Sequence, residues 1–500
     1  MIIEQEQAML KAKSEFDSML MFLKDATSQG LGLHEVERTL WERLLKIGHL
    51  SLQGFIDSQG TGDLGPTLEY EGRTVKRLEG LFDRRLESVF GEHLIQRTVY
   101  GTRLTQKHEV IPLDAKLGLP DSEFSYLLQD WDQSLCVQNS YGQSRKTIQK
   151  ILGLDQNVAS LEKMSRSMAP HVDTFHIKQQ PLAKQADKDS IVVLTADGKG
   201  VPMRRNVEKD GPAPKERLKR GEKAGKKREA CVGAVYTISP FKRTVQDVID
   251  EIQRKHKQLN RPIPQDKRLR AELTEIVEGK EVKGKARIFT WFTEELAIRN
   301  PMGSSPVVCV MDGDPNLWRM TRRVLGKANI AFVGILDLYH AMEYLWKAAY
   351  CFHGEGSAEA KDFVGNRLIR MLEGKIGYVI GGLKQMATKQ GLSQYKKKEL
   401  AKAIQYFHNN RSRMKYNEYL KQGYPIGSGV VEGACRHLVK DRMELTGMRW
   451  SVPGAQAILK LRAVSINGDW EEFQHDLREE NCRKLYPYRD VIMSKYKKTA

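Results

Sequence analysis

Two short apolar runs that end on aspartate constrain the fold more than any other feature of this sequence. Residues 190–196 (SIVVLTA) precede Asp197, residues 306–311 (PVVCVM) precede Asp312, and a glycine follows each aspartate. Length and β-branched content are typical of strands buried on both faces. The sequence therefore predicts an α/β fold with a buried sheet, in which each of these strands ends on its aspartate.

Further strands and helices follow from the same kind of pattern. Residues 230–238 (ACVGAVYTI) predict a strand that forms a hairpin with the first one, and residues 330–337 (IAFVGILD) predict another. The amphipathic segment 317–328 (LWRMTRRVLGKA) predicts a helix between two strands, which implies a parallel pair with a crossover. Residues 350–421 are predicted to be helical, whereas the charged segment 242–300 yields no clear prediction.

The charge balance bears on the partner of the chain. Lysine and arginine number 81 against 63 acidic residues, a formal net charge of +18. Such an excess favours a polyanion, because neutralising phosphates releases counterions. A basic surface that serves only solubility is the alternative. The composition thus predicts a nucleic-acid partner.

Cysteine usage and the first residues bear on the compartment. None of the six cysteines forms a C-x-x-C pair, and no Cys/His cluster has the spacing of a zinc site. The polar start MIIEQEQ is unlike a signal peptide, and no apolar run approaches the ~18 residues that span a bilayer. We expect a soluble, cytoplasmic protein.

The N-terminal half contains a candidate DNA-binding region. Two strand-like runs around Gly91 predict a hairpin, and residues 140–172 have the spacing of a helix-turn-helix. The second helix of that pair carries polar side chains that we expect to face base edges or phosphates: Ser160, Lys163, Ser165 and Arg166. An ordinary helical hairpin is the alternative.

A second basic stretch follows the first predicted strand. Residues 215–228 (KERLKRGEKAGKKR) hold eight lysines and arginines with two glycines among them, which predicts a flexible basic loop. Contact with the phosphate backbone and a merely solvated loop are equally compatible with this pattern. The residues that we expect to contact phosphates are Lys219, Arg220, Lys226, Lys227 and Arg228.

Three carboxylates occupy positions that favour metal binding. Asp197 and Asp312 end predicted strands, and Glu432 begins a predicted helix, 430–445, after the glycine-rich turn GYPIGSG. Converging carboxylates repel one another unless a cation neutralises them. Hard oxygen ligands suit Mg²⁺ or Mn²⁺, and two such ions support in-line displacement at phosphorus. We therefore predict a site for two Mg²⁺ or Mn²⁺ ions on these side chains.

Each of these carboxylates also has a structural alternative. Asp-Gly is a common turn sequence, so Asp197 and Asp312 are compatible with plain turns. Asp314 competes with Asp312 as the ligand, although the residue nearest the strand end is better held. Glu432 is also favourable simply because it lies at the positive end of its helix.

Four sequence blocks around these carboxylates resemble a known family. TADGKGVPMR, VVCVMDGDPNLW, ILDLYHAMEYLW and IGSGVVEGACRHLVKDRMELTGMRW are similar to DDE transposases of the ISKra type, bacterial insertion-sequence enzymes of the Mutator-like group. The similarity covers roughly residues 85–470. It implies a ribonuclease H-like core interrupted by a helical insertion, with Asp197, Asp312 and Glu432 as the metal-binding triad.

The resemblance also draws attention to Asp337 and His340. They match the Asp/Cys-x-x-His feature that follows the second aspartate in that family, which implies that His340 is a catalytic residue near the phosphate or orients Asp312. The structural alternative is that Asp337 caps a helix and His340 is a packed core histidine.

The block that contains Glu432 supplies three more candidates for contact with DNA. Arg436 lies four residues after Glu432, so we expect it on the same helix face, paired with Glu432 or with DNA. The resemblance suggests that Arg449 and Trp450 lie near the active site, with Arg449 at a phosphate and Trp450 stacked on an unpaired base. A buried structural tryptophan is the alternative.

The expected function is that of a bacterial DNA transposase. It would bind the terminal inverted repeats of its element as a homodimer or larger oligomer, cut a strand and join the 3′-hydroxyl to target DNA. The alternatives are a catalytically silent, domesticated DNA-binding protein and a metal-dependent nuclease of the same fold. The expected division is a helical region 1–75, a hairpin and DNA-binding region 76–185, a catalytic core 186–349 and 422–470 with its helical insertion 350–421, and a tail 471–500.

Overall fold

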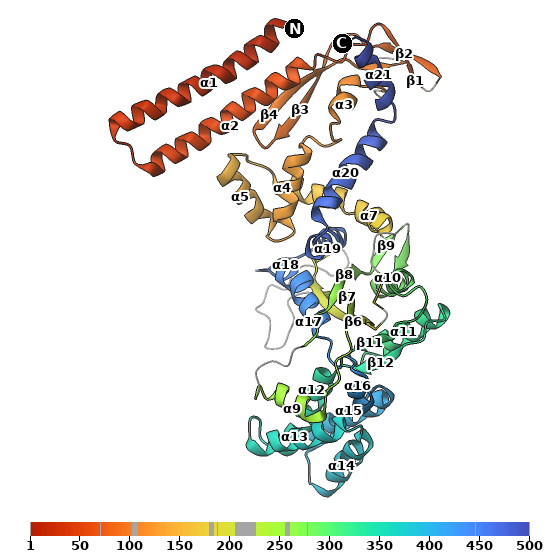
Figure 1. The fold of residues 1–500 in the computed structure, drawn as a ribbon. Helices are drawn as coiled ribbons and strands as arrows, with labels where there is room; N and C mark the ends of the chain where they lie inside the picture. The colour runs from red at the N-terminus through yellow and green to blue at the C-terminus, as the bar shows by residue number, and fades with distance from the viewer. Residues whose placement is uncertain are drawn as a thin grey trace. The chain divides into compact units, whose positions relative to one another are not determined.

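The protein forms two compact units, which a computed structural model describes (Figure 1). Unit 1 comprises Met1–His171 with Trp470–Ala500, and unit 2 comprises Val172–Asp469. The described residues are 2–70, 72–102, 109–179, 185–187, 189–205, 227–255, 261–277, 279–445 and 447–499.

Unit 1 begins with a pair of long helices and continues with short antiparallel strands. The helices separate at Gly30, whose φ of +64° is in the left-handed region that favours glycine. The predicted hairpin around Gly91 is confirmed, because β3 and β4 pair antiparallel. The elements are α1 (Ile2–Gln29), α2 (Leu33–Ser58), β1 (Thr67–Tyr70), β2 (Arg73–Arg77), β3 (Phe82–Ser88), β4 (Gly91–Arg97) and β5 (Tyr100–Gly101).

The predicted helical pair at 140–172 is also present. Lys163 and Arg166 are exposed on α6, as contact with DNA requires. Ser165 is buried and donates its hydroxyl hydrogen to Gln133 at 2.6 Å, so the expectation that it faces DNA is wrong. The helices of this region are α3 (Pro112–Leu117), α4 (Tyr126–Cys136), α5 (Tyr141–Leu152), α6 (Val158–Met168) and α7 (His171–Gln179).

The C-terminal segment is part of the core of unit 1. It forms α20 (Trp470–Leu485) and α21 (Arg489–Thr499). Side chains from this segment pack with residues near the N-terminal strands in one buried cluster that includes Leu68, Val75, Tyr100, Tyr486, Tyr488 and Ile492. The segment that we separated as a charged tail thus completes the hydrophobic core of unit 1.

Unit 2 is built on a mixed five-stranded sheet with the order β12-β11-β6-β7-β8. β6 pairs antiparallel with β7, and β7 with β8, whereas β11 lies parallel to both β6 and β12. The predicted hairpin and the predicted parallel pair are therefore confirmed, as is the α/β class. The strands are β6 (Ile191–Pro202), β7 (Lys227–Ile238), β8 (Gln265–Leu273), β11 (Val307–Met311) and β12 (Val333–Leu336).

Helices cover both faces of this sheet. In β6, Ile191 and Val193 contribute to one core, while the intervening Val192 contributes to the other, as the alternation of a strand requires. The first core is closed by helices α12 to α15 and the second by α10 and α11. These helices are α10 (Gly284–Arg299), α11 (Pro315–Lys327), α12 (Leu338–Phe352), α13 (Ala358–Leu372), α14 (Ile376–Lys389) and α15 (Gln394–Asn410).

The remaining elements of unit 2 complete the predicted helical segments. The segment 350–421 is helical throughout most of its length, and the predicted helix after the glycine-rich turn contains a π-helical stretch. These elements are α9 (Val245–Ile252), β9 (Glu275–Val277), β10 (Lys280–Val282), a 3₁₀ turn (Arg411–Arg413), α16 (Tyr416–Gln422), α17 (Gly429–Ala434), the π-helix (Cys435–Lys440), α18 (Asp441–Met443) and α19 (Val452–Asn467). Among the described residues, no helix combines the length and the apolar character that crossing a membrane requires.

Candidate metal centre

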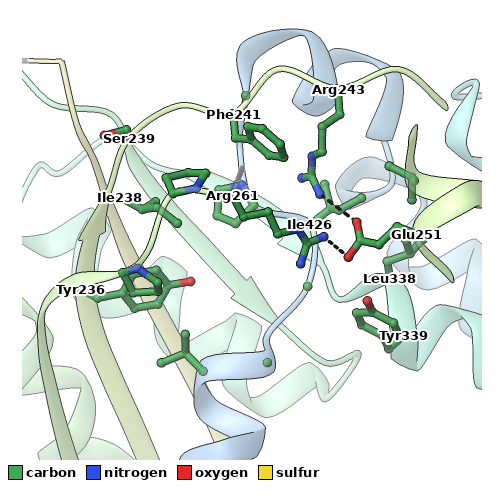
Figure 2. A pocket seen from close by; sticks show the side chains of 18 of the residues that line it. Tyr236, Ile238, Ser239, Phe241, Arg243, Glu251, Arg261, Leu338, Tyr339 and Ile426 are labelled. Atoms are coloured by element: carbon green, nitrogen blue, oxygen red, sulfur yellow. Dashed lines mark ion pairs between the residues drawn. The ribbon is translucent and has the colours of Figure 1, made fainter. Parts of the chain in front are cut away.

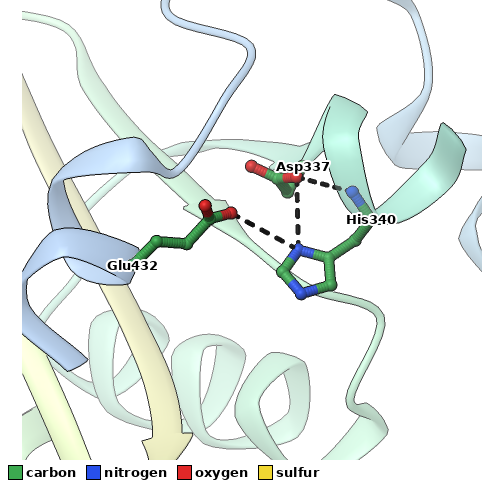
Figure 3. Close-up of side chains that lie close together, drawn as sticks. All are labelled: Asp337, His340 and Glu432. Atoms are coloured by element: carbon green, nitrogen blue, oxygen red, sulfur yellow. Dashed lines mark hydrogen bonds and ion pairs between the residues drawn. The ribbon is translucent and has the colours of Figure 1, made fainter. Parts of the chain in front are cut away.

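Three side chains with metal-ligand atoms lie together in unit 2 (Figure 3). One ligand atom from each of Asp337, His340 and Glu432 lies within 4.8 Å of the others. The Nδ1 atom of His340 is 3.2 Å from Oδ1 of Asp337 and 4.0 Å from Oε1 of Glu432. The cluster joins the start of α12 to the start of α17.

Asp337 owes its position to the junction between β12 and α12. It is fully buried and caps the helix, because its Oδ1 accepts a hydrogen bond of 2.8 Å from the backbone N–H of His340. The other carboxylate oxygen accepts the backbone N–H of Ser428. Burial alone would raise the pKa of Asp337, but the bonds from His340 and Ser428 outweigh it and lower that pKa. The expected cap is therefore confirmed.

His340 is the cationic member of this cluster. Its hydrogen bond with Asp337 raises its pKa to about 9, against the opposing effect of burial, and the charge of Asp312 adds to the increase. A histidine with this pKa is protonated at neutral pH while no metal is bound, and it donates hydrogen bonds. A cation bound at this cluster would compete with that proton for the ring nitrogen. The alternative of an ordinary packed core histidine is wrong, because the ring faces a carboxylate cluster and is only partly buried.

Glu432 projects from the first turn of α17, as the sequence predicts. Its Oε1 lies 3.5 Å from the hydroxyl of Ser428, and 46 % of its side chain is exposed. Partial burial raises its pKa, and the negative charges of Asp337 and Asp197 raise it further. The carboxylate therefore lies in a region with an excess of negative charge.

Asp312 follows β11 directly, and the loop after it is held tightly. The backbone N–H of Asp314 donates to Oδ1 of Asp312 at 3.0 Å, and the indole of Trp318 donates to its carbonyl at 2.6 Å. Burial raises the pKa of Asp312, and the charge of Asp197 raises it further. A Cβ at Gly313 would collide with the ring of Tyr406, so the glycine serves this close packing.

Asp314, the competing ligand, already has two partners. Its Oδ1 caps α11 by accepting the backbone N–H of Asn316 at 2.9 Å, and its Oδ2 lies 2.9 Å from the ammonium of Lys285. These contacts favour Asp312 over Asp314 as the ligand.

Asp197 lies within a strand rather than at its end. β6 continues to Pro202, and Asp197 pairs with Val232 across the hairpin, so both the predicted strand end and the alternative of a plain turn are wrong. The Asp-Gly pair resembles a turn in the sequence, although a Cβ at position 198 would meet only the half-exposed Glu229 side chain, at 2.8 Å. The thiol of Cys435 donates to Oδ2 of Asp197 at 3.3 Å.

The Asp197–Cys435 contact connects β6 to the helical segment of Glu432. Cys435 begins the π-helix three residues after Glu432, and π-helical stretches occur frequently at functional sites. Asp197 raises the pKa of both Asp312 and Glu432. Among the described residues, the ligand atoms that lie within 4.8 Å of one another belong to Asp337, His340 and Glu432, so the three predicted ligands are not brought together to that distance. In the described chain, no lysine or arginine forms an ion pair with any of the three.

A groove leads away from this centre along α12 and α15. Asp312 and His340 line it together with Lys347, Lys398 and Lys402. Glu343 and Glu399 lie in the same walls and pair with Lys347 at 4.0 Å and with Lys402 at 2.7 Å. Tyr344 and Tyr406 stack within the same wall, with their ring centroids 3.6 Å apart. The sequence analysis assigned no role to this groove, because α12 and α15 are brought together only by the fold.

Three residues of the C-terminal block were expected to contact DNA, and two of them, Trp450 and Arg436, have other partners in the structure. Trp450 is buried, and its indole donates to the carbonyl of Met443 at 3.0 Å, so the structural alternative is confirmed and stacking on a base is wrong. Arg436 lies 3.7 Å from Asp441 rather than pairing with Glu432, because the π-helix interrupts the α-helical spacing. Arg449 is exposed.

The predicted basic loop is described only at its end. Lys227 and Arg228 belong to β7, so they are strand residues rather than loop residues. Lys227 pairs with Glu444 at 2.5 Å, and Arg228 donates to the carbonyl of Thr274 at 3.1 Å. Lys219, Arg220 and Lys226 lie outside the described residues.

Comparison with known proteins adds no relative. No family model matches the chain, and none of the curated proteins compared with it matches either. The function therefore has to be argued from the site itself.

Proposed function

We propose that the chain is a DNA transposase that cuts and joins strands with two Mg²⁺ or Mn²⁺ ions held by Asp197, Asp312 and Glu432. The observation that carries the proposal is a group of carboxylates whose one cationic neighbour among the described residues is His340, 4.0 Å from Glu432. Asp197 raises the pKa of both other acids, and none of the three pairs with a lysine or arginine of the described chain. Such a group is stable in its ionised form when cations bind it.

The donor set suits hard divalent cations. All three proposed ligands are carboxylate oxygens, a set that matches Mg²⁺ or Mn²⁺ better than Zn²⁺. Two bound ions lower the pKa of a nucleophilic water or hydroxyl and stabilise the leaving oxygen at phosphorus.

The residues around the ligands have roles in holding the phosphate. Asp337 orients the His340 ring and keeps it protonated, which places a positive charge beside Asp312. In our proposal the imidazolium donates to a phosphate oxygen in the groove. Lys347, Lys398 and Lys402 would contact the phosphates of the strand that continues along the groove.

Further features support the DNA substrate. The net charge of +18 favours a polyanion, and Lys163 and Arg166 are exposed on a helix that follows a short turn. The mixed sheet with helices on both faces is compatible with the ribonuclease H-like core that the resemblance implies. We propose that the protein recognises the inverted repeats of its own element and acts as a homodimer or larger oligomer.

The test is the substitution Glu432→Gln in the full-length protein. The amide keeps the size of the side chain but is a poorer ligand for a hard cation. End binding, cleavage and joining are measured side by side on the DNA that flanks the coding region, with Mg²⁺. Glu355→Gln is the control, because Glu355 is an exposed acid of unit 2 that does not line the groove.

The expected result separates binding from chemistry. Cleavage and joining by Glu432→Gln should fall about 100-fold or more, with end binding unchanged or slightly stronger. Glu355→Gln should retain activity. Cleavage by Glu432→Gln at the wild-type rate would contradict the mechanism, and a wild-type protein that cuts without joining would be a nuclease. A wild-type protein that binds the ends without cutting would be a domesticated DNA-binding protein.

A further inference from the structure

A separate pocket in unit 2 lies beside the candidate metal centre (Figure 2). Its volume is about 330 Å³, at the lower end of the range of small-ligand sites. Aromatic rings and prolines form much of its wall, namely Tyr236, Phe241, Tyr339, Pro262, Pro264 and Pro425. A flat, apolar-faced group suits such walls, because stacking on rings needs little adaptation.

The polar part of this pocket consists of two arginines and one glutamate. Arg261 and Arg243 both pair with Glu251, the latter at 4.0 Å, so the three side chains together carry one net positive charge. Only 8 % of the Arg243 side chain is exposed, and its Nε is buried without a hydrogen-bond partner among the described residues. Arg243 is thus largely enclosed by the protein, whereas 49 % of the Arg261 side chain is exposed.

The pocket and the metal centre share two chain segments. Leu338 and Tyr339 line the pocket and lie between Asp337 and His340 in the sequence. On the other segment, Gly427 and Gly429 line the pocket and flank Ser428, which donates to Asp337. A Cβ at Gly427 would come within 3.0 Å of the Tyr339 ring, so the two segments are in close contact.

We propose that this pocket holds an unpaired nucleobase of the DNA strand whose phosphate lies at the metal centre. The rings would stack on the base, while Arg243, Arg261 and Glu251 would supply donors and an acceptor to its edge. The inference rests on the proposed function, because only a bound DNA strand places a base here. Enzymes that act on DNA commonly move a nucleotide out of the stack into such a pocket, and stacking offsets the cost of unpairing.

The experiment is photocrosslinking on the full-length protein. The probe is a forked DNA duplex whose unpaired thymines are replaced by 5-iododeoxyuridine, and crosslinked peptides are identified by mass spectrometry. Arg261→Ala removes a half-exposed pocket arginine, and Arg323→Ala removes an exposed arginine of α11 as the matched control. Should Arg261→Ala unfold, Ser239→Trp is the second variant, because the larger side chain would partly fill the pocket.

We expect crosslinks on peptides that contain Phe241 or Tyr339. Their yield should fall about tenfold in Arg261→Ala, as loss of a base contact implies, and stay unchanged in Arg323→Ala. Crosslinks only on other peptides would overturn the pocket assignment. So would a crosslink yield in Arg261→Ala and Ser239→Trp that equals the wild-type yield. So would a small metabolite that copurifies with the wild type and is lost in Arg261→Ala.

The same experiment distinguishes the two proposals. Pocket crosslinks in a wild-type protein that never cleaves DNA would support the base site and contradict the transposase. Cleavage that depends on Glu432, without pocket crosslinks, would support the enzyme and contradict the base site. A wild-type protein that does not bind the forked duplex would contradict both.

Discussion

Buried acids are stabilised in two different ways in the two units. In unit 1, Asp114 is only 2 % exposed, and its Oδ2 lies 2.8 Å from Arg84 and 2.6 Å from Arg97. In unit 2, Asp312 lies near Asp197 and has no such arginine in the described chain, so its pKa is raised. In unit 1 two arginines neutralise the buried acid, whereas in unit 2 His340 is the cationic neighbour, and in our proposal bound metal ions supply the remaining charge.

A third acid shows what happens when neither kind of cation is present. Asp132 of unit 1 is fully buried, and its one hydrogen bond comes from Gln156 at 2.7 Å. Burial raises the pKa of Asp132 to about 7, with a further contribution from the charge of Glu87. Protonation therefore replaces a cation here.

The largest stability effect is expected for Asp114→Ala. Removing the shared acid leaves Arg84 and Arg97 buried without a counterion, which costs about 3–5 kcal/mol of unfolding free energy. Urea denaturation of the full-length protein measures this loss. Asp155→Ala is the control, because its ion pair with Arg145 is exposed and should contribute only about 0–1 kcal/mol. Equal effects of the two substitutions would show that burial of the pair is irrelevant.

A smaller, pH-dependent effect is expected for Asp132→Asn. Because the pKa of Asp132 is about 7 in the folded protein and lower in the unfolded chain, wild-type stability falls as the pH rises between those values. The neutral amide removes this dependence, so the variant should gain on the order of 2 kcal/mol at about pH 8 and almost nothing near pH 4. Thermal unfolding at both pH values measures the difference. A gain that is independent of pH would mean that Asp132 does not titrate as described.

The smallest effect, with the opposite sign to that of Asp114, is expected for Asp312→Asn. The ionised carboxylate lies near Asp197, so its neutral replacement should stabilise the metal-free protein by about 1 kcal/mol. Mg²⁺ should then raise the melting temperature of the wild type more than that of the variant. Destabilisation of the metal-free variant would place Asp312 in the same class as Asp114.

The sequence predicts the sheet of unit 2 well, and its errors have physical causes. The apolar runs of β6 and β11 are buried on both faces, so their composition alone identifies them. The charged strand β8 was not predicted, because the partners of its polar residues lie in other elements. Glu272 pairs with Arg287 of α10 and accepts a hydrogen bond from Gln456 of α19. Only the fold reveals such partners.

The candidate site was predicted only in part, because some of its contacts also join residues that are far apart in the sequence. Strand ends and a helix start identify Asp312 and Glu432 locally. Asp197 lies within β6 because the strand stays paired with β7 as far as Pro202, whereas Asp197-Gly198 resembles a turn in the sequence. Ser428 and Cys435 were missed, because a backbone N–H donor and a thiol donor leave no distinct sequence signal.

The most direct test of the central claim is Mn²⁺ binding to the full-length protein. Titration followed by electron paramagnetic resonance compares the wild type with Asp312→Asn, and Asp155→Asn serves as the control in unit 1. We predict that the wild type and the control bind Mn²⁺, and that Asp312→Asn weakens binding about tenfold or more. Equal affinity in all three proteins, or no binding by the wild type, would contradict the proposal that this centre is completed by metal ions.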